Sequence, residues 1–264
     1  MHAGRLYVFT IPKAGTYFLA GLMGWFGWHD SGWHVAERFV LETHGTDLAT
    51  NARNPLAVRR EQLHTVTLDR LPAGHLCFGH MNPMLFQQPH AGEVAVLACR
   101  RRPRDVLVSE FIDFRFRRED ELVEFVSRRR IADDREAFAV YMRDHAPVIA
   151  DICATLVAYR ALRGTGYWTR TRPLAPYVEV AFEDLMGADP LPALRRLAES
   201  CGVRAGNDRL LQVLQAAKQA ENKTKSVGLE LPIARQALWT PDAEASWRRH
   251  GFPELSTLLG YAEL

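Results

Sequence analysis

A lysine, a glycine and a threonine follow directly on a short apolar segment near the start of the chain. Residues 5–11 (Arg-Leu-Tyr-Val-Phe-Thr-Ile) predict a strand buried on both faces, and residues from Thr16 onward predict a buried helix. Between them, Gly15 allows a tight turn whose N–H groups point into one concavity, while Lys13 adds a charge and Thr16 a hydroxyl. The segment predicts either a phosphate-type cradle or a plain strand-to-helix turn with a solvent-facing lysine.

Four arginines form a second cluster after another predicted strand. Residues 93–99 are apolar, and the sequence Arg100-Arg-Arg-Pro-Arg104 follows them, with Ser109 about two helical turns further along. Arginine presents a planar fork that matches phosphate oxygens, whereas a magnesium-dependent P-loop enzyme would end this strand in an acidic residue. The cluster predicts a bound phosphate, and a neighbouring carboxylate is the alternative partner.

Further strands and helices are predicted around these two clusters. Residues 75–79 and 177–182 predict two more strands, and residues 119–163 are predicted to be mostly helical, whereas residues 29–60 look irregular. A well-formed helix should follow, capped by Asp189, with Pro190 at its first position and Gly202 as its stop signal.

Strands alternating with helices predict an α/β fold, in which a P-loop-like parallel sheet is flanked by helices on both faces. No linker-like composition interrupts the pattern, so we expect a single domain over residues 1–264. In such sheets, ligands bind beyond the carboxyl ends of the strands, which is where both clusters of functional residues fall.

The composition is that of a globular protein. Of the 264 residues, 47% are hydrophobic and 24% are charged, which excludes a disordered chain and a fibrous one. Thirty-three lysines and arginines against 31 aspartates and glutamates leave a net charge of +2, which argues against a general nucleic-acid-binding protein.

The cysteines and the N-terminal segment indicate a cytoplasmic protein. The four cysteines are far apart in the sequence and predict reduced core thiols, with neither a disulfide framework nor a metal site; they are Cys77, Cys99, Cys153 and Cys201. The uncharged run over residues 14–28 is too short to cross a bilayer, so we expect no membrane span.

Several of these segments resemble a known enzyme family. Ile11-Pro-Lys-Ala-Gly-Thr16 resembles the 5′-phosphosulfate loop of sulfotransferases that use 3′-phosphoadenosine 5′-phosphosulfate (PAPS), and residues 101–109 resemble their 3′-phosphate motif, which opens with Arg and closes with Ser. Val180-Ala-Phe-Glu-Asp-Leu185 is similar to a strand of the family that ends in Y-E-D-L, and Leu259-Gly-Tyr261 to a frequent C-terminal ending. The resemblance spans the chain.

The resemblance implies that the first cluster holds the reactive end of the donor. Lys13 and Thr16 would contact the 5′-phosphosulfate, and Gly15 would open the loop, with Ala14 and Tyr17 contributing to the same site. Lys13 would also stabilise the leaving phosphate, and no metal would be required. The expected product nucleotide is 3′,5′-adenosine bisphosphate (PAP).

The resemblance also assigns the other end of the nucleotide. Arg101 and Ser109 would hold the 3′-phosphate, and Lys223 lies in a segment that loosely resembles a further 3′-phosphate loop of the family. Phe18 and Phe182 stand where the family has a tryptophan against adenine and a tyrosine, so both are expected to contact the nucleotide.

His80 is the expected general base. It ends the strand over residues 75–79, at a place similar to that of the catalytic histidine of mammalian cytosolic sulfotransferases, and an imidazole suits proton removal at neutral pH. A histidine that is simply hydrogen-bonded in a loop is the alternative interpretation. The other candidates for the base are His29, His34, His75 and Glu37.

The expected acceptor is the hydroxyl or amine of a small molecule, aromatic or hydrophobic in character. Aromatic residues are frequent over residues 25–33 and 111–116, where they either belong to the core or line an acceptor pocket. The sequence leaves a phenol, an alcohol, a peptide and a saccharide open, as it does the oligomeric state.

Two other functions are compatible with a strand–loop–helix start. A P-loop-type nucleotide or small-molecule kinase should carry G-x-x-x-x-G-K-[ST], but here Lys13 precedes the only glycine of the loop. A non-catalytic nucleotide-binding protein of the same fold would keep Lys13 and Arg101 without turnover.

Overall fold

The computed structural model describes residues 4–35, 39–42, 59–62, 70–84, 94–116, 131–164, 176–220, 231 and 233–262. Its internal contacts divide the chain into two compact units. The sheet unit comprises residues 1–45, 58–101 and 158–222, and the helical unit comprises residues 46–57, 102–157 and 223–264. Such units occur within single domains as well as between domains, so the single domain over residues 1–264 stays a prediction.

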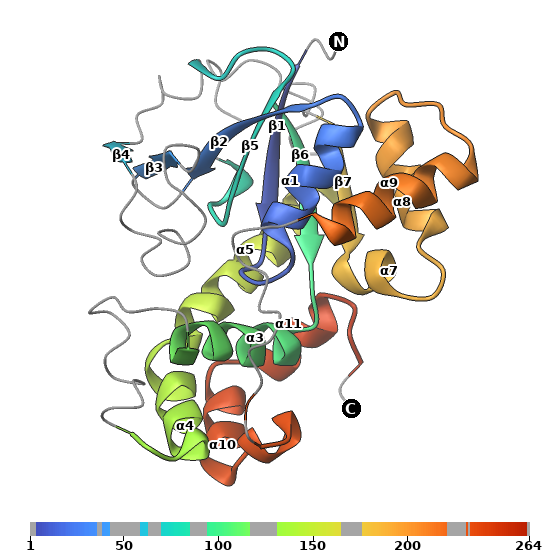
Figure 1. Ribbon diagram of the computed structural model, residues 1–264. Helices are drawn as coiled ribbons and strands as arrows, with labels where there is room; N and C mark the ends of the chain where they lie inside the picture. The colour runs from blue at the N-terminus through green and yellow to red at the C-terminus, as the bar shows by residue number, and fades with distance from the viewer. Residues whose placement is uncertain are drawn as a thin grey trace. The chain divides into compact units, whose positions relative to one another are not determined.

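The sheet unit is built on seven strands in the order β4-β3-β2-β5-β1-β6-β7 (Figure 1). The five strands from β2 to β7 along this order pair in parallel, and four of them, β1, β5, β6 and β7, are the strands that the sequence predicts. The strands are β1 (Arg5–Thr10), β2 (His29–Val35), β3 (Phe39–Glu42), β4 (Arg59–Gln62), β5 (His75–Gly79), β6 (Val94–Arg100) and β7 (Tyr177–Ala181).

The sheet continues beyond the parallel strands through a region that the sequence predicts to be irregular. Here β2 joins the sheet, and β3 and β4 extend it as antiparallel strands. In β2 the pairing register with β5 shifts between Asp30 and His34, and Gly32 takes a positive φ of 71° while its N–H is bound by the Asp30 side chain. Such an irregularity breaks the period-2 pattern that identifies a strand, so the prediction was wrong for the described residues 29–35, 39–42 and 59–60.

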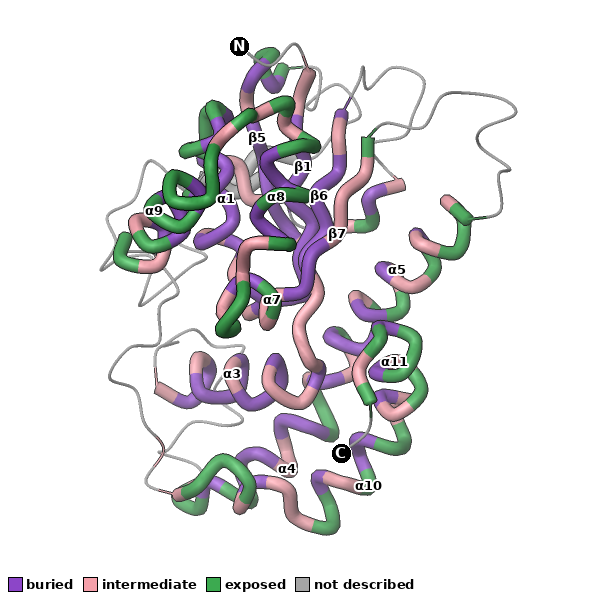
Figure 2. Tube along the Cα trace, turned by 90° about the vertical axis from the view of Figure 1, so that its right-hand side faces the viewer, coloured by how far each residue is buried: buried purple, intermediate pink, exposed green. Residues whose placement is uncertain are grey.

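The central strand of the sheet is buried on both faces. Every residue of β1 from Leu6 to Thr10 is buried, as its continuous apolar sequence predicts. Helices α1 (Thr16–Trp25), α8 (Leu191–Ser200) and α9 (Asn207–Gln219) cover one face (Figure 2). On the other face, the last turns of α5 (Ala146–Gly164) contact β7, where the rings of Tyr159 and Tyr177 lie 5.4 Å apart.

The ends of α8 agree only in part with the sequence prediction. Its stop signal is confirmed: Gly202 has a φ of 66°, and the Val203 N–H bonds back to the Ala198 carbonyl at 2.8 Å. Its predicted cap is wrong, because Pro190 and not Asp189 takes the capping position, with no side-chain hydrogen bond. Proline has no N–H, so this helix start has fewer amide groups to satisfy.

The helical unit contains α3 (Pro103–Phe116), α4 (Asp134–Asp144), the first part of α5, the 3-10 helix η4 (Arg235–Leu238), α10 (Pro241–Arg249) and α11 (Phe252–Leu258). Its core is aromatic, with the ring of Phe111 5.1 Å from that of Phe138. Phe111 and Phe114 are buried, so these two aromatics belong to the core and not to an acceptor pocket. A buried ion pair, Arg115 with Asp134 at 2.8 Å, joins α3 to the start of α4.

None of the described helices is by itself long and apolar enough to cross a bilayer. Only α4 and α5 taken together, bent by 50° relative to each other, reach that length and composition.

Candidate functional site

The loop between β1 and α1 has an unusual backbone. Lys13 has a φ of 59°, which makes it the only described residue other than glycine with a positive φ, and Gly15 has a φ of 85°. The Ala14 N–H closes the turn on the Ile11 carbonyl at 3.0 Å. A left-handed lysine is strained, and such strain is concentrated at functional sites, because the surrounding structure must hold it in place.

The loop is held in place by its neighbours in the sheet. The Sγ of Cys99, on β6, donates to the Ala14 carbonyl at 3.3 Å. Burial raises the pKa of the Cys99 thiol well above its ordinary value, so the sulfur keeps the proton that it donates. Gly15 is packed so closely on Phe182 that a β-carbon at this position would lie 2.7 Å from the ring. Gly15 is therefore needed both for its φ and for its missing side chain.

The loop and the first turn of α1 together create a region of positive electrostatic potential. Gly15 caps α1 without a side-chain hydrogen bond, and the first turn of this ten-residue helix carries no acidic residue. The amide groups of a first helical turn have no partner within the helix, so they attract an anion, and the Lys13 side chain starts from the same loop. The loop therefore has the backbone conformation that a phosphate cradle requires, and its binding role stays a prediction.

A chain of hydroxyl groups connects this loop to His80. The Oγ1 atoms of Thr10 and Thr16 are 2.6 Å apart, and the Thr10 Oγ1 lies 3.3 Å from the His80 Nδ1. Both threonines are buried and His80 is half-buried. Thr10 was not among the predicted site residues, although its place at the carboxyl end of β1 is a signal that could have found it.

One backbone contact fixes the protonation pattern of the His80 ring. Its Nδ1 lies 2.8 Å from the Thr10 carbonyl oxygen, and a carbonyl only accepts, so the Nδ1 must carry a proton. In the neutral ring, the lone pair is therefore on Nε2. A histidine oriented in this way offers Nε2 as a proton acceptor, which is the arrangement that a general base requires.

A buried tyrosine positions the backbone after His80. The Tyr7 hydroxyl donates to the Met81 carbonyl at 3.0 Å and accepts from the Met81 N–H at 2.9 Å. Burial raises the pKa of Tyr7 well above its ordinary value, so the phenol stays protonated and can make both bonds. Tyr7 was also missed from the sequence, since a tyrosine within a buried strand resembles any other core residue.

Arg101 brings the second predicted cluster to the same loop. Its Nη1 donates to the Lys13 carbonyl at 2.6 Å, and its guanidinium lies 4.8 Å from the centre of the Phe182 ring. Phe18 meets Phe182 edge-on, with the ring centres 6.3 Å apart. The residues expected at the two ends of the nucleotide, Lys13 and Arg101, are therefore neighbours at one edge of the sheet.

The other arginines of the cluster have carboxylate partners. Arg100 binds Glu179 on β7 at 2.9 Å, and Arg104 binds Glu244 within the helical unit at 2.8 and 3.0 Å. For these two residues the alternative interpretation of the sequence, a neighbouring carboxylate, is the correct one.

The remaining candidates are found in different places. The His34 ring lies 5.1 Å from the His80 ring, and the rings of Tyr17 and Phe78 contact that of His34. His29 and His75 pair at the opposite ends of β2 and β5 and so are not near this loop. Ser109 is half-buried on α3 in the helical unit, while Glu37 and Lys223 lie outside the described residues.

No metal centre is formed by the described part of the chain, where no three His, Cys, Asp or Glu residues come together in a way that could hold an ion.

Comparison with known proteins identifies the fold. The chain is similar in structure to the mouse sulfotransferase SULT7A1 complexed with PAP, with a TM-score of 0.56, 12% sequence identity, and coverage of 97% of this chain and 84% of the mouse chain. No family model matches the sequence, and no curated relative matches it. The chain therefore has a sulfotransferase fold, which confirms the predicted fold class and, at the level of the fold, the resemblance seen in the motifs.

The crowding at Gly15 yields a prediction about stability. Gly202 also has a positive φ, but a β-carbon added there would meet no atom within 4 Å, so Gly202→Ala should lower the free energy of unfolding by about 1 kcal/mol. Gly15→Ala adds a clash with Phe182, so it should cost at least about 2 kcal/mol. Urea unfolding of the two variants measures this difference, and equal losses would contradict the packing described for Gly15.

Proposed function

We propose that the chain is a PAPS-dependent sulfotransferase, which moves a sulfuryl group from PAPS to the hydroxyl or amine of a small molecule. The observation that carries the proposal is the junction of three groups at one sheet edge: the strained Lys13 loop, His80 bonded to the Thr10 carbonyl, and Arg101 bonded to the Lys13 carbonyl. The sulfotransferase fold supports it.

The loop suits the phosphosulfate end of the donor. Its backbone curvature, the open N-terminus of α1 and the Thr16 hydroxyl supply donors for sulfate and phosphate oxygens, and Lys13 supplies the charge. We assign Ala14, Gly15 and Tyr17 to the same site through their backbone. Tyr17 also places its ring against Phe78, beside His34.

Arg101 suits the 3′-phosphate end. Its guanidinium is oriented by the Lys13 carbonyl and the Phe182 ring. Part of the entropic cost of ordering this long side chain is therefore met before the nucleotide binds. Ser109 and Lys223 remain predicted partners of the same phosphate. The aromatic pair Phe18 and Phe182 is assigned to the adenosine part of the donor.

Transfer then needs one proton removed and one leaving group stabilised. The acceptor oxygen attacks sulfur, its proton passes to the His80 Nε2, and the bond from sulfur to the bridging oxygen breaks to release PAP. Lys13 stabilises the negative charge that develops on the leaving 5′-phosphate. As in phosphoryl transfer, most of the catalysis comes from positioning and from charge stabilisation.

The strand end argues against a kinase. β6 ends in Arg100 and is followed by Arg101, where a magnesium-dependent P-loop enzyme would place an acidic residue. The acceptor is proposed to be a small aromatic or hydrophobic molecule, because the His34 ring lies 5.1 Å from the His80 ring and the Tyr17 ring lies 6.3 Å from the His34 ring. The cytoplasmic location stays a prediction.

Ligand-induced stabilisation tests the proposed nucleotide. PAP without metal should raise the melting temperature of the chain, because a ligand that binds only the folded state stabilises it by mass action. ATP with magnesium at the same concentration should raise it much less. Differential scanning fluorimetry measures both shifts, and a larger shift with ATP and magnesium would favour a kinase and overturn the proposal.

Substitution of Lys13 tests the role of its ammonium group. Lys13→Met should lower kcat for sulfuryl transfer by about 100-fold or more, because the lost charge acts mainly on the transition state. PAP affinity should fall by much less. Lys218→Met, on α9, is the matched control and should keep normal kcat. Turnover of acceptor pools with PAPS is followed by mass spectrometry, and equal losses of kcat and PAP affinity in Lys13→Met would refute the assigned role.

Substitution of His80 tests the base. His80→Gln should bind PAP as tightly as the unmodified chain, but kcat should fall by about 100-fold or more, since general-base catalysis is worth that much. A variant that keeps near-normal turnover at pH 7 would show that another group accepts the proton.

A further inference from the structure

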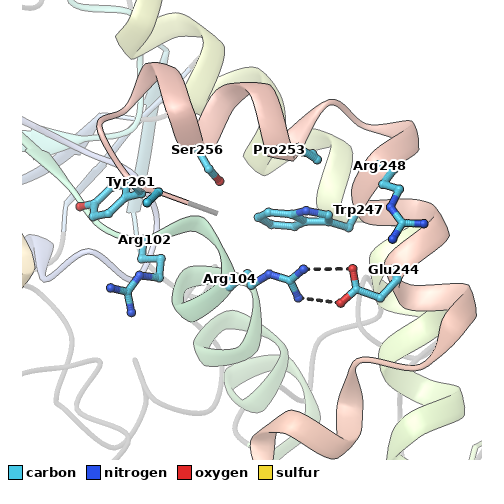
Figure 3. Close-up of a pocket in the computed structure, with 9 residues that line it drawn as sticks. Arg102, Arg104, Glu244, Trp247, Arg248, Pro253, Ser256 and Tyr261 are labelled. Carbon is cyan, nitrogen blue, oxygen red and sulfur yellow. Dashed lines mark hydrogen bonds and ion pairs between the residues drawn. The ribbon is translucent and has the colours of Figure 1, made fainter. Parts of the chain in front are cut away.

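A cavity of about 420 Å³ lies wholly within the helical unit. Its walls come from the residues just before and inside α3, from α10 and α11, and from Tyr261 and Ala262 near the C-terminus (Figure 3). Cavities of about 300–1,000 Å³ are typical of sites for small organic molecules. None of the residues assigned to sulfuryl transfer lines this cavity.

The lining carries an excess of positive charge. Three arginines and one glutamate line the cavity, which leaves a formal charge of +2. The Arg104 side chain is held in one position. Glu244 accepts two hydrogen bonds from it, and its guanidinium carbon lies 4.2 Å from the centre of the Trp239 ring and 4.6 Å from the centre of the Trp247 ring. The Arg248 guanidinium forms no hydrogen bond or ion pair with any residue that the structure describes. Its charge is available to an anion.

A buried hydroxyl faces the same cavity. Ser256 is 4% exposed, and its Oγ has no hydrogen-bond partner among the described residues. Figure 3 shows this oxygen pointing into the cavity, above the Trp247 indole. Burying an unbonded hydroxyl destabilises a protein, so such a group calls for a specific explanation. A ligand that bonds to Ser256 supplies the missing partner.

The rest of the lining is apolar and rigid. Trp247 stacks on Phe252, with ring centres 4.8 Å apart and planes inclined by 10°, and Pro253 and Ala262 add apolar surface. We propose that this cavity binds a small organic anion: a carboxylate, sulfate or phosphate group held by Arg248, on a compact apolar body that also bonds to the Ser256 hydroxyl. The site belongs to the helical unit alone, so it does not rest on the proposed function.

Phenyl phosphate is a suitable probe, because it joins an anionic group to a small ring. Isothermal titration of the full chain, in excess PAP so that the proposed nucleotide site is filled, should show saturable binding. Phenol, which lacks the charge, and inorganic phosphate, which lacks the ring, should each bind more weakly. Absence of saturable binding by phenyl phosphate up to millimolar concentration would overturn the proposal, as would equal binding of either fragment.

Two neighbouring arginines provide the matched comparison. Arg248 and Arg249 both lie in the last turn of α10 and are exposed, but only Arg248 lines the cavity. Arg248→Gln should weaken phenyl phosphate binding by about three- to tenfold. Arg249→Gln should weaken it by less than about twofold, since salt screens a more distant charge. Equal effects of the two substitutions would show that the binding is not at this cavity, whether or not PAP occupies the sheet unit.

Ser256 separates binding from a structural role. Ser256→Ala removes a hydroxyl that has no described partner, so the melting temperature of the free chain should not fall. Binding of phenyl phosphate should weaken by about threefold or more. A variant that binds as tightly as the unmodified chain, or that loses stability without ligand, would contradict the assignment of Ser256.

Discussion

The close contact between Gly15 and the Phe182 ring is the constraint on which the rest of the site depends. It fixes the loop after β1 to the end of β7, and only a residue without a β-carbon can occupy the position. Arg101 covers the same ring and binds the Lys13 carbonyl, so the loop is held by the ends of two neighbouring strands. The left-handed backbone conformation of Lys13 is tolerated because these contacts hold the loop in place.

The second layer of the site is made of buried polar groups that bond to one another. Tyr7 satisfies both backbone groups of Met81, and Thr10 bonds to Thr16 and His80. The bond from Thr10 positions the imidazole ring of His80 directly, and the bonds from Tyr7 position the backbone that follows His80. Buried polar networks in which every group is hydrogen-bonded favour a single arrangement of the core. Such a network contributes to precise positioning of the site more than to overall stability.

Sequence reasoning identified the parts of this site that depend on local pattern. The strand before Lys13 and the strand before His80 are continuous apolar runs, and the turn at Gly15 follows from the residue type. It missed Thr10 and Tyr7, because their roles depend on which strands lie side by side, and that is a property of the fold. It also missed β2, where Gly32 and a register shift hide the alternation of side chains. The carboxylates that pair with Arg100 and Arg104 are 79 and 140 residues away in the chain, so no local pattern could reveal them.

The proton on the His80 Nδ1 has a consequence for the ring when it gains charge. Because Nδ1 already holds its proton against the Thr10 carbonyl oxygen, a second proton can be added only at Nε2. Gain of that proton therefore leaves the bond from Nδ1 to the carbonyl in place. The imidazole can thus charge and discharge through a cycle while its anchor on the backbone of β1, and with it the orientation of the ring, stays the same.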